Sequence, residues 1–347
     1  MAGPVGATRP PGMQDVARVA GVSHQTVSRV LNGHPSVRPE TRDKVLAVIA
    51  ELGYRRNSAA RALVTSRSGT IGLLTPRSIL YGPVSTLISV EEAARSAGLY
   101  VSVASLRGYD EESVTAALDH FMDQGVEGII VIAPVPEAVR VASALASQVP
   151  MVLIAADTAS GPGFQTASVD QELGARLATR HLIELGHTDI AHVSGPPDWL
   201  DARARRRGWE RELRDADLKM RPPLDGGWTP EGGYEAARHF LGGRPPTAVF
   251  AANDLMALGL VRALTDAGLH VPNDISVVGF DDIAGASHYL PPLTTVRQDF
   301  AALGELSVRL LTGRPAEEET SSTLVMAPEL IVRSSATNPT RLLHPGR

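Results

Sequence analysis

From Thr70 onward, short apolar runs alternate with helical stretches, and this alternation constrains the fold more than any other feature of the chain. The runs are typical of buried parallel strands: TIGLLTP (70–76), YVSVASL (100–106), GIIVIAP (128–134), MVLIAAD (151–157), IAHVSGP (190–196), TAVFAAND (247–254) and ISVVGFDD (275–282). The segments between them are amphipathic, as at 90–98, 112–125 and 254–268. Such alternation predicts doubly wound α/β units, which bind ligands beyond the carboxyl ends of their strands. There are enough strands for two sheets.

The sequence lacks the patterns of several common classes of α/β protein. It contains no cysteine, which excludes disulfides and thiolate catalysis. Neither GxGxxG nor a GxxxxGK run followed by Ser or Thr occurs, so no dinucleotide or nucleoside triphosphate site is supported. The 10 histidines are scattered rather than spaced as metal ligands. We therefore expect neither an enzyme nor a bound cofactor or metal.

The length and composition indicate a protein of more than one domain. The chain has 347 residues, 43% of them hydrophobic, which is ample for a large core and suggests two or three domains. Its first residues, MAGPVGATRPPG, contain no apolar run after a basic patch, and no stretch approaches a membrane span. We interpret the chain as soluble, unexported and cytoplasmic, and the absence of cysteine is compatible with that compartment.

The net charge of -5 conceals an asymmetry between a basic head and an acidic remainder. Residues 1–67 carry ten Arg/Lys and four Asp/Glu, which gives +6. The remainder carries 23 Arg/Lys and 34 Asp/Glu, which gives -11. A small basic head on an acidic body indicates that the head meets a polyanion, although charge runs can also be simple solvated faces.

Residues that typically begin or end helices predict three helices in the head. The first helix ends at Gly21, a residue suited to the left-handed cap position. Ser23 can cap a second helix that extends to about Asn32. Pro39 suits the first turn of a third helix, which ends before Gly53. Two short helices joined by a tight turn, with a third to bury them, form a helix-turn-helix unit.

The second predicted helix carries polar residues suited to DNA contacts. In such a unit this helix lies in the major groove and offers its N-terminal residues to base edges. A glutamine can bond an adenine at two points, an arginine can bond a guanine, and a histidine ring can bond a purine N7. The candidate base readers share one helix face: His24, Gln25, Ser28 and Arg29. Two others suit phosphates: Ser23 and Thr26. The alternative is a solvated face without a ligand.

Two stretches of the head, DVARVAGVSHQTVSRVLNG (15–33) and VRPETRDKVLAVIAELGY (37–54), resemble the DNA-binding head of the LacI/GalR family of bacterial transcription repressors. The resemblance continues into NSAARALV (57–64), which in the family forms a hinge helix that folds on operator DNA. It implies that Leu63 wedges into the minor groove and kinks the duplex, and that Asn57 is a further DNA contact. Ordinary linker packing is the alternative for Leu63.

The rest of the chain resembles the same family along its whole length. The stretches that carry the resemblance are RRRGWERELRD (205–215), TAVFAANDLMALG (247–259), DISVVGFDD (274–282) and PPLTTVRQDFAALGELSVRLL (291–311). The family fold is an all-α helix-turn-helix headpiece followed by an α/β core like that of periplasmic sugar-binding proteins. In that core, two doubly wound parallel-sheet subdomains are joined by three crossing strands, with an effector in the cleft.

The family resemblance also supplies domain boundaries. We expect a DNA-binding domain at 12–56, a hinge helix and linker at 57–68, an effector-binding and dimerisation core at 69–337, and a tail at 338–347. Within the core, the expected subdomains are 69–167 with 298–327, and 168–297 with 328–337.

The resemblance places a set of effector-binding residues in the cleft. Polyol recognition needs planar groups that bond at two points, and often an aromatic face for the C–H side of a sugar ring. The residues that match the family's cleft positions are Leu80, Arg205, Trp228, Asn253, Asp281, Gln298 and Phe300.

Several of these assignments have alternatives. Asp254 is expected to cap its helix rather than to bind a ligand. Asp282 could serve equally well as the carboxylate assigned to Asp281. Arg205 lies in an arginine-rich helix whose neighbours suit surface charges, and Trp228 could be plain packing.

The sequence departs from the family at positions that affect the pocket. Ala155 stands where a member of the family has an acidic sugar ligand, and Asp157 could replace that acid only if its loop shifts. Pro76 stands where a small polar residue is expected, and Asp201 where a serine is expected. The resemblance therefore implies a sugar pocket altered in detail.

The C-terminal tail bears on assembly. One member of the family has a tetramer-forming tail that is a leucine heptad, whereas ATNPTRLLHPGR (336–347) is short and broken by prolines. Because a two-fold operator needs two heads, we expect a homodimer.

Together these features predict a nucleoid-associated, homodimeric repressor that binds palindromic operator DNA. We expect a small neutral sugar, a galactoside or another hexoside, to release it. One alternative is the same fold sensing a purine or phosphosugar as corepressor. Another is a sugar receptor that does not bind DNA, which the basic head and the missing signal sequence oppose.

Overall fold

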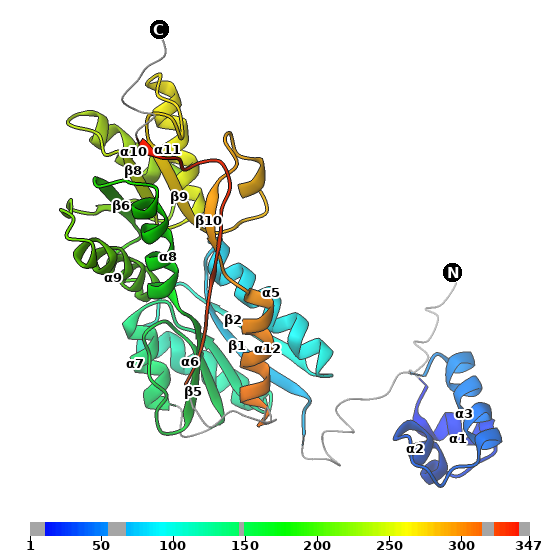
Figure 1. The fold of residues 1–347 in the computed structure, drawn as a ribbon. Helices are drawn as coiled ribbons and strands as arrows, with labels where there is room; N and C mark the ends of the chain where they lie inside the picture. The colour runs from blue at the N-terminus through cyan, green and yellow to red at the C-terminus, as the bar shows by residue number, and fades with distance from the viewer. Residues whose placement is uncertain (1–10, 55–66, 146–148, 314–322, 340–347) are drawn as a thin grey trace, which may run out of the picture. The chain divides into compact units, whose positions relative to one another are not determined.

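Figure 1 shows the protein as a computed structural model, which describes residues 11–54, 67–145, 149–313 and 323–339. The chain divides into two compact units, Met1–Ser68 and Gly69–Arg347, here called the head and the body.

The head contains three helices in its described part: α1 (Met13–Ala20), α2 (His24–Leu31) and α3 (Pro39–Leu52). Gly21 ends α1 with a φ of 63°, a left-handed conformation that glycine adopts without strain. The Ser23 hydroxyl caps α2 by accepting from the Thr26 amide at 3.1 Å. Gly53 ends α3, again in the left-handed region. The predicted helices and their caps are confirmed.

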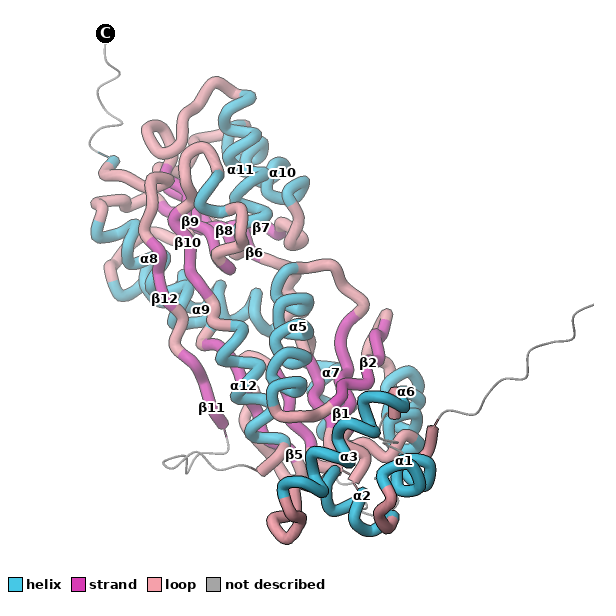
Figure 2. The backbone as a smooth tube through the Cα atoms, turned by 90° about the vertical axis from the view of Figure 1, so that its right-hand side faces the viewer, coloured by secondary structure: helices cyan, strands magenta, loops and turns pink. Residues whose placement is uncertain are grey.

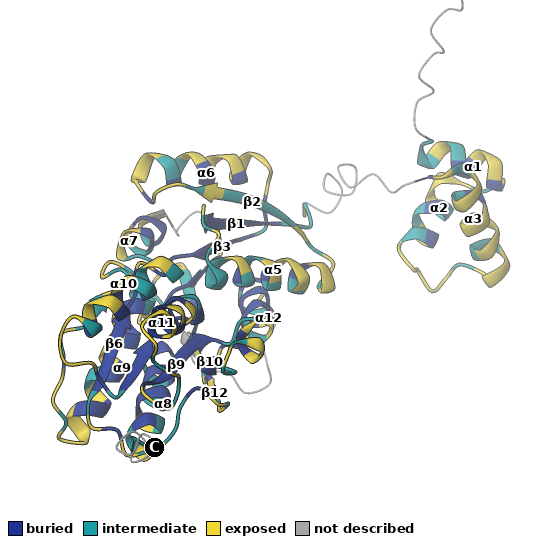
Figure 3. Ribbon diagram, turned by 90° about the horizontal axis from the view of Figure 1, so that it is seen from above, coloured by how far each residue is buried: buried dark blue, intermediate teal, exposed yellow. Residues whose placement is uncertain are grey.

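A small apolar core holds the three helices together. It comprises Val16, Ala17, Ala20, Val27, Val30, Val45, Val48 and Tyr54. Val27 and Val30 are the buried positions of α2, so its polar residues lie on the other side of the helix. Figure 3 shows buried and exposed residues alternating along these helices.

The body contains two six-stranded sheets. The first sheet has the order β11-β5-β4-β3-β1-β2, and all neighbouring strands pair in parallel. Its strands are β1 (Thr70–Pro76), β2 (Tyr100–Leu106), β3 (Ile129–Ile132), β4 (Met151–Ile154), β5 (Phe164–Val169) and β11 (Thr323–Met326).

The second sheet has the order β12-β10-β9-β8-β6-β7. Its strands are β6 (Ile190–Ser194), β7 (Leu224–Asp225), β8 (Ala248–Ala251), β9 (Ser276–Asp281), β10 (Thr294–Arg297) and β12 (Glu329–Ile331). They pair in parallel except for β12, which is antiparallel to β10.

Helices cover both faces of each sheet, as Figure 1 shows. They are α5 (Tyr81–Ser96), α6 (Glu111–Asp123), α7 (Pro136–Leu145), α8 (Gln171–Glu184), α9 (Leu200–Asp215), α10 (Pro230–Leu241), α11 (Asp254–Asp266) and α12 (Phe300–Leu311), with a short 3₁₀ helix η1 (Ala286–His288). On the first sheet, α6 and α7 bury one face and α5 and α12 the other. On the second, α10 and α11 bury one face and α8 and α9 the other. This arrangement confirms the predicted fold class.

Two features of the sheets differ from the predictions. β2 was expected to be buried, but it lies at the edge of its sheet and Tyr100 remains 70% exposed, because an edge strand has a neighbour on one side only. Five strands, β5, β7, β10, β11 and the antiparallel β12, were not among the predicted runs. β7 and β12, with two and three residues, are too short to show periodicity.

The described chain passes between the two sheets at three places. It crosses after β5 into α8, after β10 into α12, and from β11 to β12. Figure 2 shows β12 of the second sheet above β11 of the first, with β10 leading into α12 beside them. The cleft between the sheets is therefore bordered by these crossing segments.

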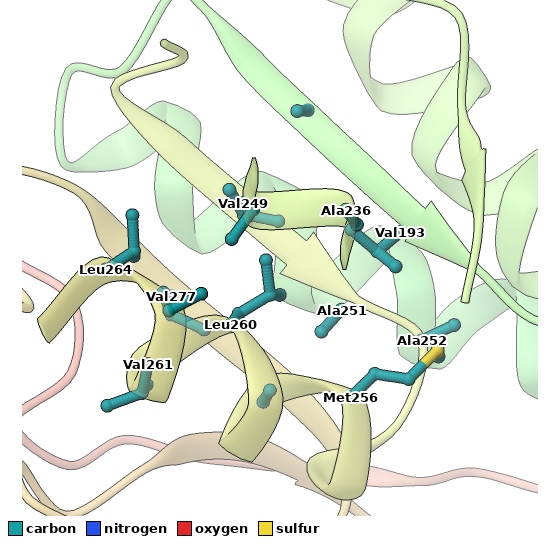
Figure 4. Close-up of a cluster of buried hydrophobic side chains, with 14 of the residues drawn as sticks. Val193, Ala236, Val249, Ala251, Ala252, Met256, Leu260, Val261, Leu264 and Val277 are labelled. Carbon is teal, nitrogen blue, oxygen red and sulfur yellow. The ribbon is translucent and has the colours of Figure 1, made fainter. Parts of the chain in front are cut away.

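Packing of α11 against the second sheet fixes the residues that follow β8. Figure 4 shows Leu260 of α11 near Val249 of β8 and Val277 of β9, and Met256 of α11 extending toward Ala252, and all five side chains are at most 1% exposed. Close packing of this kind leaves the first turn of α11 little freedom. None of the described helices is long and apolar enough to cross a membrane.

Candidate functional sites

The polar face of α2 is open to solvent. His24, Gln25 and Arg29 are exposed, whereas Ser28 and Thr26 are partly buried. Because Gln25 and Arg29 lie one turn apart, they point in the same direction and could contact neighbouring base pairs.

The hydroxyl groups at the start of α2 bond one another. Ser23 Oγ and Thr26 Oγ1 lie 2.9 Å apart, beside the amides of the first helical turn. A phosphate at this helix end would meet hydroxyl and amide donors together. The predicted DNA contacts Asn57 and Leu63 lie outside the described residues.

A cleft between the two sheets of the body brings all seven predicted effector residues together. It consists of two adjoining hollows. The first is lined by Leu80, Tyr81, Gly82, Pro83, Trp199, Asp201, Arg205, Trp228, Asn253 and Asp281. The second contains Gln298 and Phe300 together with Ala155 and Gln171, and it shares Gly82, Pro83, Trp199 and Asp201 with the first.

Arg205 is the most heavily bonded side chain in the cleft. It is 3% exposed, and its guanidinium lies 3.8 Å from the centre of the Phe280 ring and 5.4 Å from that of Trp228. Its Nε donates to Gln171 Oε1 at 2.9 Å, and its Nη1 donates to the Ala252 carbonyl. Arg205 therefore differs from its neighbours Arg206 and Arg207, which are exposed as the sequence predicted.

Arg205 belongs to a closed ring of buried polar side chains. Its Nη2 lies 3.5 Å from Asp281 Oδ1, which also accepts from Gln298 Nε2 at 2.8 Å. Gln171 completes the ring by donating to Gln298 Oε1 at 2.7 Å. Burial raises the pKa of Asp281 to about 6, while the Arg205 charge and the Gln298 bond oppose that rise. Asp281 also has a φ of 105°, an unusual backbone conformation held by these surroundings.

Two tryptophans lie at one side of the cleft. The Trp228 ring is 5% exposed and meets Trp199 edge to face, with 5.8 Å between ring centres. A Cβ on Gly195 would lie 2.2 Å from Trp228, so the ring needs that glycine behind it. Trp228 has a φ of 66°, and its buried Nε1 has no hydrogen-bond partner among the described residues. Trp228 therefore both packs in the body and borders the cleft.

The cap of α11 differs from the prediction. Asn253, not Asp254, caps the helix by accepting from the Met256 amide at 2.8 Å, and its Nδ2 donates to the Trp228 carbonyl at 3.1 Å. Asp254 is fully buried and instead accepts from Thr295 Oγ1 at 2.5 Å. Burial raises the pKa of Asp254 to about 8. An Asn is as good a cap as an Asp, so the sequence alone could not separate the two.

The structure distinguishes the carboxylates that the sequence left as alternatives for the cleft: Asp281, Asp282 and Asp157. Asp281 borders the cleft, whereas Asp282 accepts from Arg297 and Arg333, each at 2.7 Å. Asp157 pairs with Arg207 and does not line either hollow of the cleft.

The structure also shows where the residues that depart from the family pattern lie. Asp201 lines both hollows, and Ala155 lines the second. Pro76 ends β1 and lines neither hollow.

The cleft residues that the sequence did not indicate include Tyr81, Gln171 and Trp199. Trp199 and Tyr81 stand at or just before helix N-termini that follow strands, a position that favours ligand contact in α/β folds. The sequence around Gln171 did not indicate that this residue lies in the cleft, because its hydrogen-bond partners are 34 and 127 residues away. No cluster of His, Cys, Asp or Glu suited to a metal occurs among the described residues.

Comparison with known families gives two matches. A model described as bacterial regulatory proteins, lacI family, matches residues 12–57, and a periplasmic binding protein-like domain matches residues 179–336. The lactose operon repressor of Escherichia coli K12 is 38% identical over 306 residues, which cover 87% of this chain and 84% of the relative. The repressor PurR of Haemophilus influenzae PittEE is 35% identical over 334 residues, with 93% and 98% coverage.

Solved structures of similar proteins agree. The lac repressor dimer bound to operator and the anti-inducer ONPF matches with a TM-score of 0.82 and 34% identity, covering 95% of this chain and all of that one. The complex of the transcriptional regulator CelR with cellobiose matches with a TM-score of 0.68 and 31% identity, covering 94% and 100%. A helix-turn-helix head before a periplasmic-binding-protein-like body defines a class of DNA-binding transcription regulators. The chain belongs to the lacI family of that class and is a DNA-binding repressor.

Replacing Asp254 by Asn is expected to reduce the pH dependence of stability. With a pKa of about 8, Asp254 keeps its proton in the folded chain at pH values where the unfolded chain has lost it. The free energy of unfolding therefore falls as pH rises from about 4 to 8, by at most about 1.4 kcal/mol per pH unit from this group. Urea denaturation at several pH values in this range measures how steeply the free energy of unfolding changes with pH in the wild type and in the variant. Equal slopes in wild type and Asp254→Asn would contradict a protonated Asp254.

Replacing Gln25 or Arg29 by Ala is expected to relax base preference at one position in each half of the DNA site. Each loss of a two-point base contact costs about 1–3 kcal/mol of binding. Selection of bound sequences from a random duplex pool measures the change, with exposed Glu51→Ala of α3 as the control. An unchanged consensus for Arg29→Ala would refute its assignment as a base reader.

Proposed function

We propose that the chain is a homodimeric repressor that binds a two-fold symmetric operator and leaves it when a small neutral saccharide enters the cleft. The observation that carries the effector class is the bonding of Arg205. Its guanidinium is already engaged by Gln171, Ala252 and Asp281. A ligand must therefore be recognised chiefly by groups other than a free positive charge.

The charges around the cleft favour an uncharged ligand over a phosphorylated one. Among the described residues that line it, Arg205 is the only cation, and Asp201 and Asp281 are both carboxylates. A phosphate binds where arginines, lysines or free amides converge, and these hollows offer no second cation for it. Hydroxyl groups, in contrast, can donate to carboxylates and accept from amide groups such as Asn253.

The aromatic residues support a saccharide. Trp199, Trp228 and Phe300 line the cleft from different elements, so a sugar ring could place its C–H face on an indole. The similar regulator CelR is known in complex with cellobiose, and another relative is the lactose operon repressor. We include galactosides among the first candidates, together with β-linked glucose disaccharides.

Contacts across the cleft suggest how occupancy reaches the head. Gln171 and Gln298 stand on two of the segments that cross between the sheets, and both bond within the Arg205 ring. Outside that ring, the Leu200 amide donates to the Pro134 carbonyl at 2.8 Å and joins the two halves of the body. A ligand that favours one arrangement of the halves would change DNA affinity, and DNA would change ligand affinity by the same factor.

An exposed apolar strip supports dimerisation through α5. Val84 and Ile88 lie one turn apart on this helix and are 37% and 49% exposed, and Ile79 just before it is 97% exposed. Figure 2 shows α5 and α12 side by side on the face of the body toward the viewer. Burying such a strip against a second copy would remove apolar area from water. We expect the dimer to act in the cytoplasm, at the nucleoid, where its operator lies.

Purine sensing is the second candidate function, because the similarity to PurR, at 35% identity, extends over 93% of this chain. A purine is flat and uncharged, so the charge argument does not exclude it. The deciding experiment is selection of bound duplexes from a random pool, repeated with neutral sugars, sugar phosphates and purines. We expect a palindromic consensus whose retention falls with a neutral sugar. Retention that rises with a purine and ignores every sugar would overturn the proposal.

Replacing Ile88 by Glu is expected to convert the dimer to monomers, because a charge in a buried apolar interface is costly. Sedimentation equilibrium at micromolar concentration measures the mass, and operator affinity should fall with it. Met220→Glu, at a residue 47% exposed beyond α9, is the control. A tetramer in the wild type, or an unchanged dimer in the Ile88 variant, would contradict this interface.

Replacing Trp228 by Ala is expected to weaken saccharide binding strongly while the ligand-free protein still binds its operator. The lost stacking surface is the physical reason. Calorimetry with the responding sugar measures the change, and Trp228→Phe should retain part of the affinity. Because Trp228 also packs in the body, thermal unfolding is compared in parallel. Equal sugar affinity in a folded Trp228→Ala protein would mean that the ring only packs.

A further inference from the structure

An ion pair joins the two halves of the body beside the cleft. Asp157 lies in the loop that follows β4 of the first sheet, and Arg207 lies on α9, which covers the second sheet. Arg207 Nη2 donates to Asp157 Oδ2, and the two side chains are 44% and 41% exposed. This surface contact must break if the halves separate at this edge.

Each partner of the pair is fixed within its own half. Two residues before Asp157, the Ala155 amide donates to a carbonyl of β5 at 3.3 Å, which fastens the loop to the first sheet. Directly after Arg207, Gly208 packs so closely on the backbone of α8 that no Cβ would fit there. Asp157 therefore moves with the first sheet, and Arg207 moves with α8 and α9.

Arg207 keeps a second partner when the pair opens. Its Nε lies 3.3 Å from Glu172 Oε2, and Glu172 stands on α8 in the same half. This contact holds the guanidinium near Asp157, so less side-chain freedom is lost when the pair forms. When the halves separate, Arg207 retains Glu172 and Asp157 is hydrated, so the contact can open without leaving a buried charge unpaired.

The segments that carry the pair also line the cleft. Ala155 and Ala156, directly before Asp157, line its second hollow, and Arg205, two residues before Arg207, lines its first. Separation of Asp157 from Arg207 would therefore move opposite walls of the cleft apart.

We propose that Asp157 and Arg207 form an ionic latch that stabilises the described arrangement of the two halves and so sets the balance between operator binding and effector binding. This inference rests on the proposed function, because it takes operator and saccharide to favour different arrangements of the body. Breaking the latch shifts the body toward the other arrangement. Affinity for one ligand then rises while affinity for the other falls.

The test compares Asp157→Asn, Arg207→Gln and the double variant with the wild type. Operator affinity is measured without effector, on a duplex of the selected consensus, and saccharide affinity is measured by calorimetry with lactose and cellobiose as the first probes. Glu210→Gln is the matched control, because it removes a partly exposed ion pair within α9, in which Arg206 donates to Glu210 at 2.7 Å.

We expect Asp157→Asn and Arg207→Gln to change operator affinity and saccharide affinity in opposite directions, each by about two- to fivefold. The double variant should resemble either single variant, because both substitutions remove the same contact. Glu210→Gln should retain wild-type affinity for both ligands.

Salt provides a readout that a purely structural role would not change. A neutral saccharide has no charge to screen, so its affinity responds to ionic strength only through charges of the protein. Raising the salt concentration from about 0.05 to about 0.5 M should shift the wild-type saccharide affinity in the same direction as Asp157→Asn does. The variant should lose most of this shift, and an equal salt response in the two proteins would contradict an ionic latch.

Failure of the latch and failure of the proposed effector are distinguishable. Wild-type operator affinity in folded Asp157→Asn and Arg207→Gln proteins, or an equal fall in affinity for both ligands, would exclude the latch while the saccharide effector would stand. Failure of every neutral saccharide to bind the wild type would overturn the proposed effector, and operator affinity without effector would still decide whether the latch exists.

Discussion

The body depends on one buried cation. The Arg205 guanidinium stacks on Phe280 and is bonded to side chains or backbone from α8, β9 and the end of β8. A charge removed from water this completely is tolerated only when hydrogen bonds and a counter-charge surround it. Asp281 supplies the counter-charge, and the two glutamines fix its orientation and that of Arg205. The cleft is therefore shaped before any ligand arrives.

The same bonds connect the cleft to the segments that cross between the sheets. Gln171 begins α8 directly after the first crossing, and Gln298 lies between β10 and α12 at the second. Movement of one half of the body against the other would alter the geometry of both residues. A ligand that bonds to this ring thus acts on the parts of the chain whose positions distinguish one arrangement of the body from another.

Local sequence was sufficient to predict the elements that depend on local chemistry. The head followed from caps such as Ser23 and Gly21, whose bonds lie within a few residues. The strand at 70–76 followed from an apolar run that the structure buries on both faces. The edge position of β2 did not, because a strand's place in its sheet depends on pairing with distant segments. The seven predicted effector residues converge on one cleft, but Gln171 and Trp199 became evident only when the fold brought them beside Arg205. Asn253 and Asp254 show the same limit, since both residue types can cap a helix and only packing decided between them.

We propose that effector binding and operator binding both depend on one equilibrium between arrangements of the two halves of the body. The most direct test is calorimetric measurement of the affinity for the responding saccharide, with and without a saturating operator duplex. The account predicts that operator lowers saccharide affinity by the same factor by which saturating saccharide lowers operator affinity. Saccharide affinity that is unchanged by operator would contradict it.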